Sequence, residues 1–208
     1  KISFLPDPEI FEQTTRFSST DVKNRLHETA YLNPDLTIPF RDFRDGRSEE
    51  TIFHEPEGLR AYITALNRGQ ETVTPLIYFK DTSGGTEVEC CFQYVDAFEE
   101  NIHGFCNNIF TQEGGTHITG FKARYTQLIN TYARQLGILK EKDTNFTGAD
   151  TRNGMTCVIA IKFRDPIFEG QTKTKLASAE ASVDVAAVTG EKLEHYFDRN
   201  VETIKSIL

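Results

Sequence analysis

Apolar residues recur along the chain at two different spacings, and the wider spacing predicts four of the five expected helices. The wider repeat is three to four residues, which places apolar side chains on one face of a helix. A cap residue, Ser19, begins the first helix, and the Asn33-Pro34 pair ends it. Gly69 and Gly137 end the second and the third. The predicted helices cover 19–33, 59–69, 118–137 and the residues from 201 onward.

Alternation of apolar and polar residues predicts the strands. Over 87–94, valine, cysteine, phenylalanine and tyrosine take one face, while two glutamates, Cys91 and Gln93 take the other. This alternation predicts a sheet that is buried on one face and wet on the other. Residues 155–163 are nearly all apolar and rich in β-branched types, so they are predicted to form the central strand. Further strands are predicted within 1–11, in a hairpin over 36–53, over 76–80 and 101–109, and at the start of 183–197, where a helix follows.

The order of these elements predicts the fold class. Strands and helices alternate, with hairpins among them, so an α+β two-layer sandwich fits best. Residues 140–153 are polar and are predicted to form a loop before the central strand. The apolar pattern of the last helix still continues at Leu208, so we expect the chain to be truncated within that helix.

Composition is that of an ordinary soluble globular protein. The 208 residues can bury a real core in one or two domains, and 38% are hydrophobic against 26% charged. No apolar run is long enough to span a bilayer and no signal-peptide pattern is present, so a cytoplasmic location without a membrane partner is expected. The net charge of −8 repels nucleic acid overall, so any DNA contact must come from a local basic patch.

Neither the cysteines nor the histidines predict a metal site. The four cysteines (Cys90, Cys91, Cys106 and Cys157) show no Cys-x-x-Cys spacing, which argues against zinc and against a disulfide framework. They are predicted to be small buried hydrophobic residues in a reducing compartment. None of the five histidines forms a metal-binding pair along the sequence, and His117, which follows Gly-Gly-Thr, is predicted to be a cap or a packed turn residue.

Common catalytic motifs are also missing from the sequence. There is no Gly-x-x-x-x-Gly-Lys-Ser/Thr string, no Gly-x-Gly-x-x-Gly after a strand and no nucleophile elbow. Glu99 and Glu100 form a carboxylate pair by adjacency alone. Because neighbouring residues on a strand face opposite ways, this pair is predicted to be a solvated edge.

One loop, residues 168–176, combines groups that suit an anion. Gly170 lets the backbone approach a ligand closely. The amide of Gln171 and the ammonium of Lys173 direct hydrogen-bond donors and positive charge at one place, which suits a terminal phosphate. A solvated turn is the alternative for this string, and it is the preferred interpretation for Lys175.

Several strings in the chain occur together in an order that is typical of one family. They stand at 4–11, 107–109, 113–117, 120–123 and 165–176. The Glu-Gly-Gly-Thr-His and Gln-Thr-Lys strings are highly specific at this separation. Together the strings resemble the family of the B subunit of bacterial DNA gyrase, and nearly as well its paralogue in topoisomerase IV. The resemblance spans essentially all 208 residues.

The resemblance implies two parts. Residues 1–55 correspond to the tail of a GHKL ATPase domain, and residues 56–208 to a transducer domain with a left-handed βαβ crossover of the ribosomal-protein type. The 208 residues hold no counterpart of the family's catalytic glutamate, magnesium-binding asparagine, Asp-x-Gly-x-Gly motif, ATP lid, TOPRIM metal site or cleavage tyrosine. We therefore expect ATP and Mg²⁺ to serve the full-length protein, and this fragment alone to bind and hydrolyse no ATP.

The resemblance also carries roles for three residues. Gln171 and Lys173 match the family's loop that reaches the γ-phosphate of ATP, with Lys173 in a catalytic role. Lys122 matches a position where the family commonly has arginine, lining the cavity through which the transported duplex passes. Here the charge is kept and the guanidinium fork is lost. An ordinary solvated helix lysine is the alternative for Lys122.

The function that the resemblance implies is that of a type IIA topoisomerase, an ATP-hydrolysing enzyme that supercoils or relaxes DNA by double-strand passage. Its implied partners are DNA, the A subunit of the enzyme and a second copy of the B subunit. One alternative is a stand-alone regulatory or interaction module with the same fold and no ATP coupling. Another is a GHKL-type mismatch-repair or chaperone protein, which should lack the Glu-Gly-Gly-Thr-His string.

Overall fold

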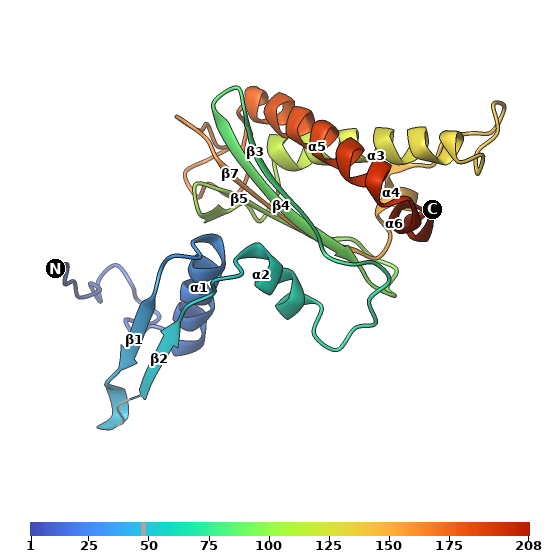
Figure 1. Cartoon of the computed structure of the whole chain (residues 1–208). Helices are drawn as coiled ribbons and strands as arrows, with labels where there is room; N and C mark the ends of the chain where they lie inside the picture. The colour runs from blue at the N-terminus through green and yellow to red at the C-terminus, as the bar shows by residue number, and fades with distance from the viewer. Residues whose placement is uncertain (47–48) are drawn as a thin grey trace. The chain divides into compact units, whose positions relative to one another are not determined.

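The structure, a computed structural model, describes residues 1–46 and 49–208, and the chain divides into two compact units. The first unit is residues 1–58 and the second is residues 59–208. Figure 1 colours the chain from blue at the start of the first unit to red at the end of the second.

The first unit contains a helix and a hairpin. Helix α1 (Ser19–Leu32) begins where the Ser18 hydroxyl accepts a hydrogen bond from the Asp21 amide at 3.2 Å. Strands β1 (Ile38–Asp42) and β2 (Glu49–Phe53) pair antiparallel. The predicted first helix and hairpin are therefore confirmed.

The strand that was expected within residues 1–11 does not form. Ile2 and Phe4 are 93% and 76% exposed, and none of the described residues pairs with this segment as a strand. Pro6 and Pro8 lack the amide hydrogen that a ladder requires, so two apolar residues are not enough to make a strand here.

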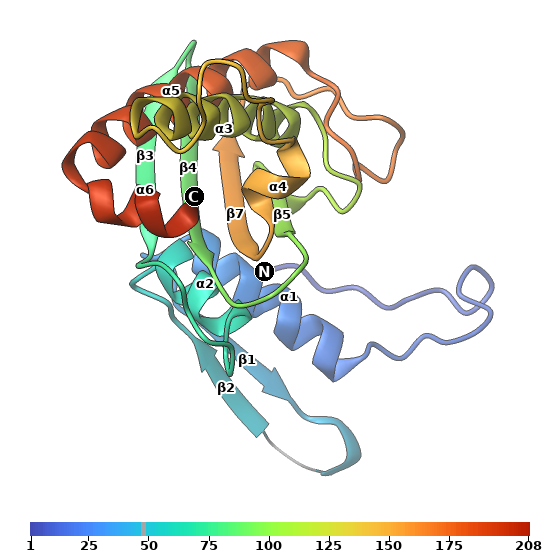
Figure 2. The same ribbon diagram turned by 90° about the vertical axis from the view of Figure 1, so that its right-hand side faces the viewer.

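The second unit is built on a five-stranded sheet. Its strands are β3 (Ile77–Ser83), β4 (Thr86–Tyr94), β5 (Asn101–Cys106), β6 (Ile109–Phe110) and β7 (Met155–Lys162). Their order across the sheet is β3-β4-β7-β5-β6, which places the predicted central strand in the middle (Figure 2). Strand β7 pairs antiparallel with β4 and parallel with β5. Parallel neighbours need a crossover connection, and β5 reaches β7 through a long helix.

Helices cover both faces of this sheet. They are α2 (Leu59–Leu66), α3 (Thr116–Gln135), α4 (Gly148–Arg152), α5 (Ala179–Arg199) and α6 (Val201–Ile207). Helices α3 and α5 lie side by side on one face, and α2 lies on the other (Figure 1). The predicted α+β class and the predicted second, third and last helices are therefore confirmed. The prediction of two layers is wrong, because helices on both faces of the sheet make three.

The main core lies between the sheet and the pair of helices α3 and α5. Phe92 of β4 meets Tyr125 of α3 edge-on with 5.6 Å between ring centroids, and both side chains are fully buried. The hydroxyl of Tyr94 lies 2.7 Å from that of Tyr125 and donates to the carbonyl of Thr151. Both buried phenols are therefore satisfied, as interior polar groups must be.

The second face of the sheet is covered, which corrects the prediction of a face open to water. Cys91 and Val158 point away from α3 and α5, yet both are 0% exposed because α2 packs over their strands. Ile63 of α2 is fully buried as well, and the ring of Tyr62 lies 6.2 Å from that of Phe105. One helix of only eight residues thus supplies a third layer, on the opposite face of the sheet from α3 and α5.

Residues 183–197 belong to one helix, α5, rather than to a strand followed by a helix. The valines at the start of this stretch alternate with polar residues, which imitates a strand. In the structure Ala181, Val185 and Val188 are buried at helical spacing, while Val183 is 69% exposed. Packing against α3 therefore overrides the local β-branched pattern.

Two connections also differ from the prediction. Asn107 and Asn108 have φ angles of 50° and 64°, so residues 101–109 are two strands joined by a tight turn rather than one strand. The predicted polar loop before β7 contains α4, which begins with a capping box between Thr147 and Asp150.

All four cysteines are free and buried, as predicted. Burial raises the pKa of Cys91 to about 12 and that of Cys106 to about 11, so both remain thiols at neutral pH. The sulfurs of Cys90 and Cys157 lie 3.8 Å apart, too far for a disulfide bond.

His117 is packed in the first turn of α3, as predicted. Its side chain is 0% exposed, and its Nε2 lies 3.2 Å from the hydroxyl of Thr111. Burial lowers the pKa of His117 to about 4, so the imidazole is neutral in the folded protein at neutral pH.

Gly120→Ala is predicted to destabilise the second unit. Helices α3 and α5 approach so closely that an added Cβ would lie 2.3 Å from the carbonyl oxygen of Ser182. Overpacking of this kind costs about 1–3 kcal/mol, which denaturant unfolding measures as a lower midpoint. Gly190→Ala is the matched control, because there the added atom meets the movable side chain of Arg124. Equal midpoints for the two variants would contradict the close packing at Gly120.

The buried imidazole predicts a loss of stability in mild acid. The unfolded chain binds a proton at His117 below about pH 6.5, whereas the folded chain binds it only near pH 4. The free energy of unfolding should therefore fall by about 2–3 kcal/mol more in the unaltered chain than in His117→Asn between pH 6.5 and 4.5. Unfolding curves at both pH values measure this difference. The same fall in both chains would contradict the prediction, and exposed His195→Asn is the control.

Candidate functional site

The predicted phosphate loop is the tip of a narrow finger, residues 167–178, that connects β7 to α5. The two sides of the finger pair with each other. The amide of Glu169 donates to the carbonyl of Lys175 at 2.9 Å, and the amide of Ala177 donates to the carbonyl of Ile167 at 2.8 Å. These hydrogen bonds fix the base of the finger.

Gly170 to Thr174 form the tip of the finger. Gly170 has a φ of 81°, and Lys173 has a φ of 57°, a left-handed conformation that costs a non-glycine residue free energy. The amide of Lys173 donates to the carbonyl of Gly170 at 3.4 Å, which closes the turn. Gln171, Thr172 and Lys173 are all exposed.

The two lysines of the finger have different electrostatic surroundings. Nζ of Lys175 lies 3.1 Å from Oε1 of Glu169, so its charge is compensated. Lys173 forms no ion pair with any residue that the structure describes, and its Nζ lies 5.9 Å from the ring centroid of Phe168. At that distance the attraction of the ring is weak, so the charge of Lys173 is available to a ligand.

Lys122 lies on α3 and takes part in an ion-pair cluster. Its ammonium pairs with Oε1 of Glu100, and Nε of Arg152 donates to Oε2 of Glu100 at 2.6 Å. The side chain of Arg152 is only 12% exposed, and it also donates to the hydroxyl of Thr126 at 3.0 Å. Burial alone raises the pKa of Glu100, but the hydrogen bonds from Lys122 and Arg152 outweigh it and hold that pKa below its usual value.

Glu99 and Glu100 are both exposed, as the prediction of a solvated edge requires, but Glu100 also takes part in ion pairs that were not predicted. Glu100 holds cations from α3 and α4, which lie 22 and 52 residues further along the chain. No local sequence signal marks such a long-range pair. Among the described residues, Lys122 makes no hydrogen bond or ion pair with Gln171 or Lys173, so the predicted site residues occupy two separate places.

The two most specific strings of the sequence meet in the structure. The amide of Glu113 donates to the carbonyl of Thr174 at 2.9 Å, and the amide of Leu176 donates to the carbonyl of Gly114 at 3.2 Å. Gly115 and Leu176 form a parallel bridge. Figure 2 shows the orange finger beside the yellow-green segment that leads into α3. The 113–116 segment therefore runs alongside the finger and is hydrogen-bonded to it.

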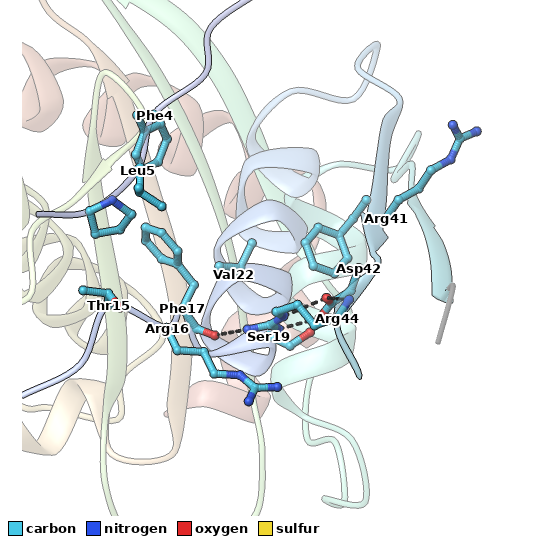
Figure 3. A pocket seen from close by; sticks show the side chains of 12 residues that line it. Phe4, Leu5, Thr15, Arg16, Phe17, Ser19, Val22, Arg41, Asp42 and Arg44 are labelled. Carbon is cyan, nitrogen blue, oxygen red and sulfur yellow. Dashed lines mark hydrogen bonds and ion pairs between the residues drawn. The ribbon is translucent and has the colours of Figure 1, made fainter. Parts of the chain in front are cut away.

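A hollow of about 800 Å³ lies in the first unit and was not predicted from the sequence (Figure 3). Phe4 and Phe17 contribute to its apolar wall. Arg44, in the 3₁₀ turn η1 (Arg44–Gly46), donates to both carboxylate oxygens of Asp42 and to the carbonyl of Phe17. The side-chain hydrogen bond from Arg44 holds the pKa of Asp42 well below its usual value, so Asp42 is not a candidate general base.

Metal and membrane features are both missing from the described part of the chain. Over residues 1–46 and 49–208, no group of three or more histidine, cysteine, aspartate or glutamate side chains could hold a metal ion. Within the same residues, no helix is both long and apolar enough to cross a membrane.

Comparison with known proteins gives one consistent result. Residues 58–208 match the family described as DNA gyrase B. Over its whole length the chain is 40% identical to the B subunit of DNA topoisomerase 4 from Staphylococcus epidermidis, of which it covers 32%. It is 41% identical to the B subunit of DNA gyrase from Clostridium acetobutylicum, again covering 32% of that protein. The chain thus spans about a third of the length of the curated relatives it matches.

Solved structures lead to the same family. The 43K ATPase domain of Thermus thermophilus gyrase B, solved in complex with an aminocoumarin, matches with a TM-score of 0.82 at 33% identity, over 97% of this chain and 54% of that one. The B-subunit of the DNA gyrase from Myxococcus xanthus matches with a TM-score of 0.76 at 25% identity, over 90% of this chain and 58% of that one. This chain therefore belongs to the DNA gyrase B family.

Proposed function

We propose that this chain is the transducer portion of the ATPase subunit of a type IIA DNA topoisomerase. The full enzyme would supercoil or relax DNA by ATP-dependent double-strand passage. The observation that carries the proposal is the uncompensated ammonium of Lys173, which stands beside Gln171 at an exposed loop tip in a chain of this family.

The residues at the finger tip fit a terminal phosphate. Lys173 supplies a cation and Gln171 an amide donor, and phosphate oxygens accept hydrogen bonds from both. In the full-length protein, ATP with Mg²⁺ would supply the phosphoryl group for transfer to water. Lys173 would then stabilise the charge that develops on that group, and Gln171 would orient it. The sequence contains no counterpart of the family's catalytic base, so turnover requires the rest of the protein.

Coupling of ATP hydrolysis to domain movement would arise because the contacts of the finger tip depend on the γ-phosphate. While the phosphate is present, the finger tip is held against it, and loss of the phosphate releases the tip. Order and release of one segment is a common switching device in nucleotide-dependent proteins. We propose that this release lets the domains rotate and the DNA gate move.

The two compact units fit the two parts that the family resemblance implies. We assign residues 1–55 to the tail of a GHKL ATPase domain and residues 56–208 to the transducer. The helix α3 and its flanking strands β5 and β7 would form the left-handed crossover of the transducer. The parallel pairing of β5 with β7 and the family match over 58–208 support this assignment.

DNA, the A subunit of the enzyme and a second copy of the B subunit are the proposed partners, in the cytoplasm. Lys122 would line the cavity for the transported duplex. The net charge of −8 makes any such contact local and weak. Because Glu100 already compensates part of the charge of Lys122, the lysine has to leave that carboxylate to reach a phosphate.

Lys173→Ala in the full-length protein is predicted to lower the rate of ATP hydrolysis by about 10²–10³-fold, because charge on the phosphoryl group is no longer stabilised. Binding of ADP should persist, since ADP lacks the γ-phosphate. Steady-state turnover and ADP titration measure both. Lys175→Ala is the matched control, because Lys175 is paired with Glu169. Unchanged turnover in Lys173→Ala, or turnover by the 208-residue chain alone, would contradict the proposal.

Lys122→Ala in the full-length protein is predicted to weaken duplex binding and to reduce the slope of log affinity against log salt by about one. Lys122→Arg should keep the slope, because the charge remains. Titration of a labelled duplex at several salt concentrations measures this slope. A slope that Lys122→Ala leaves unchanged would place the lysine outside the DNA path.

A further inference from the structure

We propose that residues 113–116 form a clamp that positions Lys173, with Thr116 as its key positioning residue. The clamp grips the base of the finger and leaves only the tip free to meet a phosphate. This inference rests on the proposed function of Lys173 and adds residues that act through it rather than on the phosphate.

The clamp consists first of a backbone ladder. The amide of Glu113 donates to the carbonyl of Thr174 at 2.9 Å, directly beside the tip. The amide of Leu176 donates to the carbonyl of Gly114 at 3.2 Å, and the amide of Thr116 donates back to the carbonyl of Leu176 at 3.1 Å. Three hydrogen bonds thus fix the segment that follows Lys173.

Backbone conformation and steric crowding explain why glycines stand at positions 114 and 115 of the clamp. Gly114 and Gly115 have φ angles of 80° and 139°, which L side chains rarely adopt. A Cβ on Gly115 would lie 2.5 Å from the carbonyl oxygen of Leu176 and 2.6 Å from its nitrogen. Both atoms are backbone and cannot swing aside, so the close approach of the clamp to the finger requires glycine at 115.

Thr116 adds a side-chain contact to the backbone ladder of the clamp. Besides its amide contact with Leu176, its hydroxyl donates to the carbonyl of Ser178 at 2.6 Å. The hydroxyl of Ser178 in turn accepts from the amide of Ile167 at 2.9 Å, on the other side of the finger. Thr116 is the first residue of α3, and Ser178 directly precedes α5. The hydroxyls of Thr116 and Ser178 together therefore tie both sides of the finger base to the starts of two helices.

Burial shows that the finger base is fixed while the tip is free. Leu176 is 1% exposed and belongs to the main core, whereas Gln171 to Lys173 are exposed. Lys173 also has a left-handed backbone, and such a conformation persists only where the surrounding structure imposes it. The clamp supplies that constraint at the residues immediately after the tip.

The clamp also links the finger to the helix that carries Lys122. Thr116 and Lys122 lie on the same helix, about 9 Å apart along its axis at 1.5 Å per residue. A change in finger position on phosphate release would therefore act first on the start of α3.

The test uses the full-length protein with Thr116→Val, which keeps the shape of the side chain and removes the hydroxyl donor. We expect kcat for ATP hydrolysis to fall about 10- to 100-fold, because a small misplacement of a catalytic group is costly, while ADP affinity stays unchanged. Thr116→Ser should restore most of the rate. Thr131→Val is the matched control, since the exposed hydroxyl of Thr131 donates within α3, to the carbonyl of Gln127, away from the clamp.

A double variant separates positioning from general damage. If Thr116 acts only through Lys173, then Thr116→Val with Lys173→Ala should be no slower than Lys173→Ala alone. An additive loss, or a kcat for Thr116→Val within about twofold of the unaltered protein while Lys173→Ala is inactive, would overturn the clamp. If Lys173→Ala keeps its full rate, the proposed function fails instead.

Hydrogen exchange decides the question if Thr116→Val does not fold. In the unaltered full-length protein the amides of Thr116 and Leu176 should exchange as slowly as those of β7, because both are donors in the clamp. Exchange as fast as that of the exposed amide of Thr172 would overturn the proposal.

Discussion

The close approach of α3 and α5 is the constraint on which the rest of the second unit depends. Gly120 allows the backbone of Ser182 into space that a side chain would fill. The two helices can then cover one face of the sheet together. Thr116, the first residue of α3, and Ser178, which directly precedes α5, come within hydrogen-bonding distance. The finger leaves the sheet at the end of β7 and returns at this junction. The base of the finger is fixed because it is hydrogen-bonded to the starts of α3 and α5, and these two helices pack closely against each other.

The two lysines of the finger and Lys122 differ in whether a carboxylate compensates their charge. The chain carries a net charge of −8, and Glu100 compensates both Lys122 and Arg152. Lys175 is similarly paired with Glu169. Lys173 has no such carboxylate among the described residues, and it sits on a strained backbone at an exposed tip.

Local patterns were sufficient wherever one face of one element decides its structure. Helices α1, α2 and α3, the first hairpin and β7 all follow from spacing and from cap or stop residues. The same reasoning failed where packing against another helix determines the secondary structure or the burial of a residue. Val183 has strand-like neighbours but lies in α5 because its neighbours pack on α3, and Cys91 is buried because α2 covers it. The segment around Ile2 and Phe4 has strand-like apolar residues, but no described residue pairs with it as a neighbouring strand.

The sequence by itself determined the family and the α+β class, because strings and residue types are local properties. The sequence also places Gln171 and Lys173 in one loop. Only the tertiary structure decided what surrounds them. The contact between residues 113–116 and 174–178, and the pairing of Glu100 with Lys122, join positions far apart in the chain. Such contacts depend on how the helices and strands pack, which no stretch of sequence encodes alone.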